Sequence, residues 1–341
     1  MPAVAQLLIH GAASMGRAGG SVPAMTAVVG PDPLARLATL PGVTDAVTAA
    51  RTSVDTLLRH RVMRRDSAKV TAEASLRTAR ASAALDGHDI DLDDLRDHLV
   101  HDLPVATVAG DSDSLRVTLG AVRLHAELGT LRDTWDRAPR QALARMHVLV
   151  ARGLLTDADL GRPRVAGRSS PAVEPAVMDD LPTPATAGSC TDPADPLALG
   201  PAPTPAEATA RLDGLTQLLL ARTSAPAIIT AAIVEGELLA IRPFGAFDGI
   251  IARAAGRLVL ISRGLDPKAV TATDVGHVEA AQIPGEQTCT GGAPGGYAAA
   301  ARAYIGTDAR GVGQWIIHYA RAVELGARES LAICEAITRA S

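Results

Sequence analysis

The sequence predicts an all-α fold, and three observations lead to that prediction. Hydrophobic residues make up 47% of the 341-residue chain, whereas aromatic residues make up only 2%. A core of Ala, Leu, Val and Ile suits close helix packing, and all-β sandwiches usually depend on aromatic side chains. Apolar residues also recur at three- and four-residue steps. Finally, helix-starting and helix-ending residues bracket these segments.

In the first half of the chain this periodicity predicts helices throughout residues 32–100. An Ala-rich helix over 67–85 ends just before Gly87, the residue type expected beyond a helix C-terminus. Two further helices are predicted over 114–127 and 137–154.

Residues 156–205 contain ten prolines and little periodicity, so they predict a long loop. Helical order resumes at Thr204 and Glu207, a capping box with proline between its two members. Two close-set helices, 226–239 and 249–263, should then flank a compact turn.

A glycine-rich linker at 291–296 leads to closing helices over 297–304 and 315–339. The pattern divides the chain as follows: a disordered tail at 1–30, an N-terminal helical region at 31–135 that includes the helix at 67–87, a core at 136–290, and C-terminal helices at 291–341. A true start at Met25 is an alternative for the tail.

Composition excludes several classes of protein. The net charge of −4 gives no overall field for nucleic acid or an anionic membrane, so neither partner is expected. No stretch of roughly 18 uncharged apolar residues predicts a membrane span. Three widely separated cysteines predict neither disulfides nor a metal knuckle, and we expect a cytoplasmic protein.

Common enzyme motifs are missing from the sequence: it has no GxGxxG before a helix, no GxxxxGK(S/T) and no GxSxG. His98 and His101, with Asp97 and Asp102, could hold a metal, but such spacing on an acidic helix is more typical of a solvated face. We therefore expect no metal site.

A short basic run precedes the Ala-rich helix and consists of Arg59, Arg61, Arg64 and Arg65. It could contact phosphate or form a solvated helix face, and the acidic net charge favours the second alternative.

The segment 241–258, IRPFGAFDGIIARAAGRL, resembles the HPFx(D/E)GNGRxxR signature of Fic (Fido) proteins. Upstream, Ser82, Asp86 and Gly87 are similar to the S-x-x-x-E-G inhibitory helix of the N-terminally inhibited Fic class. Three further pieces stand in matching order and resemble the family's helix, its PGxxR loop and its C-terminal tryptophan: 145–153, 161–164 and Trp315. The whole resemblance covers about residues 67 to 320.

The resemblance implies an all-α Fic-type domain with an N-terminal helical extension. In that family the signature histidine acts as base toward a target hydroxyl, and an acidic residue holds Mg²⁺. The Asn and glycines shape the nest that receives the nucleotide, and two arginines hold its phosphates. Members often pair through their helices, which implies a homodimer here.

The signature is degenerate in this chain. Arg242 stands in the histidine position, and a guanidinium cannot lose its proton near neutral pH to act as a base. Ungapped alignment puts Ala246 at the metal-binding carboxylate, Phe247 at the first glycine, Asp248 at the asparagine and Ile250 at the first arginine. The matching residues are Pro243, Phe244, Gly249 and Arg253.

The turn should still end at a helix N-terminus, where unpaired N–H groups can hold an anion near Phe244, Gly249 and Arg253. Asp248 before Gly249 is also an ordinary helix N-cap, which would use those N–H groups itself. Arg242 could be a ligand for an anion or the partner of a nearby acid or carbonyl. Asp86 should pair with Arg253.

These residues predict a Fic-like protein that is inactive in adenylyl transfer and acts as a binding or assembly module, with an unknown protein partner. The alternative is an active nucleotidyl- or phosphate-group transferase that uses Arg242 electrostatically. ATP and Mg²⁺ enter only through the resemblance, and because no carboxylate aligns for the metal we expect weak binding or none.

Overall fold

The computed structural model describes residues 32–101, 112–167, 195–280, 295–306 and 308–340. Within these ranges the chain is helical and contains no strand, which confirms the all-α prediction. The predicted tail at 1–30, most of the Pro-rich loop and most of the glycine-rich linker lie outside the described residues.

The first half of the chain forms short and medium helices. They are α2 (Pro33–Leu37), α3 (Val43–Arg59), α4 (Val62–Arg65), α5 (Ser67–Leu85), α6 (Leu92–His101), α7 (Ser112–Glu127), the 3₁₀ helix η2 (Leu128–Leu131), α8 (Arg132–Arg137) and α9 (Pro139–Ala151). The second half contributes α10 (Pro205–Leu220), α11 (Ala227–Ile241), α12 (Asp248–Ser262), α13 (Thr273–Ala280), α14 (Gly295–Ile305) and α15 (Ala309–Ala340).

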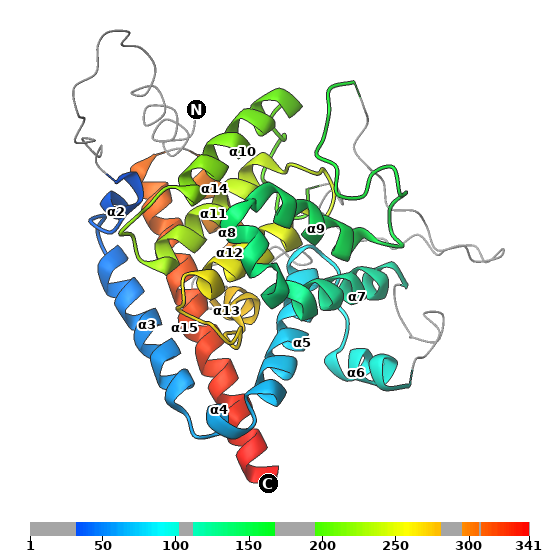
Figure 1. Ribbon diagram of the computed structural model, residues 1–341, viewed down its shortest axis with the longest axis vertical. Coiled ribbons are helices and arrows are strands. Elements are labelled where there is room, and N and C mark those ends of the chain that lie inside the picture. The colour runs from blue at the N-terminus through cyan, green and yellow to red at the C-terminus, as the bar shows by residue number, and fades with distance from the viewer. Residues whose placement is uncertain (1–31, 102–111, 168–194, 281–294, 307, 341) are drawn as a thin grey trace, which may run out of the picture.

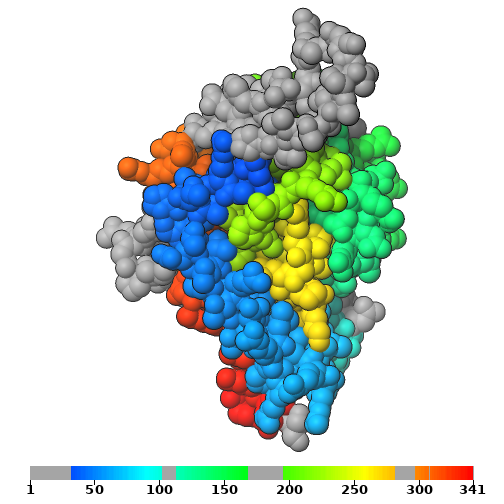
Figure 2. Space-filling model, turned by 60° about the vertical axis from the view of Figure 1, so that its left-hand side comes forward, coloured from blue at the N-terminus to red at the C-terminus, as the bar shows by residue number. Residues whose placement is uncertain are grey.

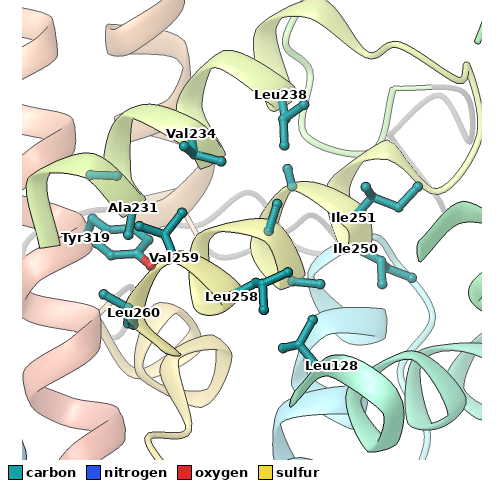
Figure 3. Close-up of a cluster of buried hydrophobic side chains, with 14 of the residues drawn as sticks. Leu128, Ala231, Val234, Leu238, Ile250, Ile251, Leu258, Val259, Leu260 and Tyr319 are labelled. Carbon is teal, nitrogen blue, oxygen red and sulfur yellow. The ribbon is translucent and has the colours of Figure 1, made fainter. Parts of the chain in front are cut away.

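Helices α11 and α12 form an antiparallel hairpin at the centre of the molecule (Figure 1). Every residue of α11 from Ile228 to Ile241 is buried, as expected for a helix that is apolar on all sides. Figure 3 shows Val234 of α11 on the side that meets α12, and Leu258 of α12 directed toward Leu128 in η2. The hairpin is therefore the centre of the hydrophobic core.

The long helix α15 packs along α3, α13 and α14, so helices from the first and last parts of the described chain lie side by side (Figures 1 and 2). Its crossing with α13 depends on glycine. A Cβ built on Gly276 would lie 2.9 Å from the Gly326 nitrogen, closer than real Cβ contacts allow. The two helix backbones are in direct contact there.

Most predicted helices are confirmed to within a few residues, and the capping box at Thr204 is present. Two predictions need correction, and one helix, α13, was not predicted. The helix expected over 137–154 ends at Ala151. His98, expected on a solvated face, is buried, whereas His101 is exposed. Asp102 lies outside the described residues.

Candidate functional site

The turn between α11 and α12 has an unusual backbone. Arg242 and Phe247, at its two ends, both have positive φ angles, 43° and 57°. Residues with a Cβ rarely adopt this conformation, so neighbouring contacts must hold the turn in place.

The Asp248 carboxylate supplies two of those contacts. It accepts hydrogen bonds from the backbone N–H groups of Phe244 at 3.0 Å and Gly245 at 2.7 Å. Burial raises the pKa of Asp248 to about 7, although these two hydrogen bonds act in the opposite direction. The expectation that Asp248 is the helix N-cap is wrong, because the helix begins at Asp248 and its side chain turns back to close the turn.

Arg164 holds the other side of the turn. Its guanidinium donates to the carbonyl oxygens of Arg242 at 2.8 Å, Ile241 at 3.0 Å and Pro203 at 3.1 Å. The backbone N–H of Arg164 donates to the Pro243 carbonyl at 2.8 Å. Carbonyl groups at the end of a helix lack partners within the helix, and Arg164 supplies donors to them here.

Arg242 directs its guanidinium to neighbouring protein groups. It donates to the Gly200 carbonyl at 2.7 Å and lies 3.7 Å from the Asp195 carboxylate. These contacts are with a nearby carbonyl and acid, as in one of the two alternatives for Arg242.

Phe244 contributes its ring to packing. It stacks on His147 with ring centroids 4.5 Å apart and an interplanar angle of 15°. The His147 Nδ1 accepts a hydrogen bond from the Gly161 N–H at 2.9 Å, so the neutral ring carries its proton on Nε2. Burial lowers the pKa of His147 to about 4. A neutral His147 therefore ties the loop at Gly161 to the turn.

Helix α5 brings Ser82 and Asp86 to Arg253 of α12. Arg253 donates to the Asp86 carboxylate at 2.9 Å, to the Ser82 hydroxyl at 2.9 Å and to the Ser82 carbonyl at 2.7 Å. Only 1% of Arg253 is exposed. The predicted ion pair is confirmed, and Gly87, with φ of 91°, follows the helix end as expected.

The same carboxylate lies against the N-terminus of α12. A Cβ built on Gly249 would be 2.8 Å from the Asp86 Cγ, so only glycine lets the two groups approach. A helix N-terminus attracts negative charge, and Asp86 places a carboxylate beside it.

Buried polar groups continue behind Arg253 toward α13 and α15. Tyr297 donates to the Glu235 carboxylate at 3.0 Å, and His277 Nε2 lies 3.3 Å from the same oxygen. Asp274 lies 3.7 Å from Arg253. Burial lowers the pKa of His277 to about 3, so His277 is neutral near neutral pH. Burial also raises the pKa of Glu235 to about 7, so about half of the Glu235 side chains carry a proton at that pH.

Sequence reasoning did not identify this group of residues. The available signal was the pair Glu235 and Glu237 within the otherwise apolar α11, because buried carboxylates require partners. Glu237 finds its partners in Arg211 at 2.9 Å and Tyr304 at 2.8 Å.

The residues present do not fit ATP with Mg²⁺. Ala246 offers no oxygen at the position that aligns with the metal-binding carboxylate. Asp248 already binds the N–H groups of Phe244 and Gly245, and Asp86 lies over Gly249. Among the described residues, no group of three or more His, Cys, Asp or Glu side chains could hold a metal ion.

Comparison with known proteins supports the fold. No family model and no curated protein matches this sequence. A Fic family protein from Desulfovibrio desulfuricans G20 is similar in structure, with a TM-score of 0.58, 15% identity, and coverage of 86% of this chain and 75% of that one. Fic-1 from C. elegans is similar with a TM-score of 0.54, 15% identity, and coverage of 88% of this chain and 74% of that one.

The chain therefore has the Fic-type all-α fold. None of the helices in the described ranges is long and apolar enough to span a membrane.

Proposed function

We propose that this chain uses the Fic-type fold as a binding or assembly module and does not transfer adenylyl groups. The contact of Asp86 with Arg253 and Gly249 carries the proposal. It supplies negative charge to a guanidinium and a helix N-terminus that would otherwise attract phosphates.

The histidine position supports the same proposal. A guanidinium stays protonated near neutral pH and cannot accept a proton from a hydroxyl group. The contacts of Arg242 with Gly200 and Asp195 also direct it to protein partners.

Calorimetry with ATP and Mg²⁺ tests the proposal. We expect weak binding or none to the wild-type chain, and stronger binding after Asp86→Ala, because that change frees Arg253 and the helix N-terminus. Affinity in the micromolar range for the wild-type chain would contradict the proposal. Covalent AMP on the protein after incubation with labelled ATP would contradict it directly.

Assembly is the second part of the proposal. We propose a homodimer and an as yet unknown protein partner, based on the Fic-type fold. Sedimentation equilibrium of the full chain tests for the homodimer. A monomer at all accessible concentrations would contradict that part of the proposal.

A further inference from the structure

A pocket of about 450 Å³ lies between α4 and the end of α15, away from the turn described above. Figures 1 and 2 place α4 at the lower end of the molecule beside the C-terminal end of α15, whereas α11 and α12 occupy the centre. Its lining residues are Arg61, Val62, Arg64, Arg65, Asp66, Ile337 and Thr338.

Three arginines thus line one pocket, and Arg59 at the end of α3 adds a fourth nearby in the sequence. All four arginines are exposed. Within the described part of the chain, their side chains make no hydrogen bond or ion pair. Some exposed arginines on other helices, such as Arg145 and Arg328, are paired with glutamates. Others, such as Arg36 and Arg51, make no side-chain hydrogen bond or ion pair within the described residues, so the feature specific to this cluster is that its arginines line one pocket.

The single acid in the pocket lining is already paired. The Asp66 carboxylate lies 2.9 Å from the Lys69 ammonium group, so a residue outside the arginine cluster neutralises its negative charge. The pocket therefore concentrates positive charge in a chain whose net charge is −4. Unpaired like charges repel one another, and a bound anion would relieve that repulsion.

We propose that this pocket binds a small molecule with a diphosphate or triphosphate group. Guanidinium groups bind phosphate oxygens through paired N–H donors, and three of them match the charge of two or more phosphates. The volume is within the range of roughly 300 to 1,000 Å³ that small-ligand pockets have. Val62 and Ile337 offer apolar surface to the rest of such a ligand. This proposal is independent of the proposed function at Arg242 and Arg253.

The test is calorimetry of the full chain with inorganic diphosphate, triphosphate and orthophosphate. We expect saturable binding of one diphosphate or triphosphate per chain, and much weaker binding of orthophosphate. Raising the salt concentration from about 50 to about 500 mM should weaken binding, because these charges are exposed.

A triple variant, Arg61→Gln, Arg64→Gln and Arg65→Gln, should lower the affinity at least about tenfold, as expected for the loss of charge-assisted hydrogen bonds. The matched control removes three exposed arginines that do not line the pocket: Arg36→Gln, Arg51→Gln and Arg132→Gln. It should change the affinity less than about threefold, since only the overall charge is altered. Circular dichroism checks that both variants remain folded.

Two results would overturn the proposal. The first is the absence of saturable binding of diphosphate and triphosphate by the wild-type chain at low salt. The second is an equal loss of affinity in the triple variant and its control. If the wild-type chain binds long duplex DNA but neither diphosphate nor triphosphate, the proposal is also overturned. The arginines would then form a surface that binds polyanions.

Discussion

Asp86 accepts a hydrogen bond from Arg253 at 2.9 Å, and this contact joins the C-terminal end of α5 to the first turns of α12. The Asp86 side chain is 11% exposed and that of Arg253 is fully buried. The charge of Arg253 therefore depends on Asp86 and on the more distant Asp274.

Replacement of Asp86 should destabilise the fold. Removing one partner of a buried ion pair leaves an uncompensated charge, and we expect Asp86→Ala to lower the free energy of unfolding by about 3 kcal/mol. Urea unfolding measures the change. The control is Asp89→Ala. Asp89 and its partner Arg80 are much more exposed than Asp86 and Arg253, so this change should hardly affect stability. Equal effects of the two changes would contradict a structural role for the buried pair.

Gly249 provides a second test of the same contact. Gly249→Ala should destabilise the wild-type chain, because the new methyl group collides with Asp86. In the Asp86→Ala background the same change should cost less, so the two effects should not add. Gly129→Ala is the control, since a Cβ there meets no atom within 4 Å. Additive effects of the two substitutions would show that the carboxylate does not occupy this position.

Glu235 should make stability depend on pH. Its pKa is about 7 in the folded chain, whereas the ordinary value, expected in the unfolded chain, is 4.5. Between these pH values the folded state holds a proton that the unfolded state has lost, so this group's contribution to stability falls as pH rises.

Glu235→Gln removes that dependence while keeping an oxygen for Tyr297. Relative to wild type, the variant should become more stable from pH 4.5 to pH 7, by up to about 3 kcal/mol. Urea unfolding of both proteins across this range gives the difference. A difference that does not change with pH would show that folding does not raise the pKa of Glu235. Comparison with wild type is needed because buried histidines such as His147 have the opposite dependence: their lowered pKa values make stability fall as pH falls below 6.5.

The sequence predicted the long helices well and parts of the site poorly, for identifiable physical reasons. Helix α5 has regular periodicity and a glycine beyond its end, so its bounds were predicted. Helix α13 has only eight residues and no apolar stripe, because it packs through Gly276 and buries polar side chains. The pairing of Asp86 with Arg253 followed from a known motif order. The inward turn of Asp248 could not be predicted, because it depends on the positive φ angle of Phe247.

The final prediction concerns Arg242→His. This change restores a side chain that can accept a proton near neutral pH, but it should not produce adenylyl transfer. A base is effective only where the reacting phosphate is held in line and its charge is neutralised. Ala246 and Ile250 offer neither an oxygen for Mg²⁺ nor a donor for phosphate, and Asp86 still binds Arg253.

Recovery should require a combined variant. It contains Arg242→His, Ala246→Asp, Phe247→Gly, Asp248→Asn, Ile250→Arg and Asp86→Ala. Because Ile250 is fully buried, the new arginine must displace core packing, so circular dichroism has to accompany the assay. Incubation with labelled ATP and Mg²⁺, scored for covalent AMP on the protein, compares wild type, Arg242→His and the combined variant. We expect no labelling of the first two proteins. Labelling of either protein would contradict the alignment of this turn with the Fic signature or the proposed loss of adenylyl transfer.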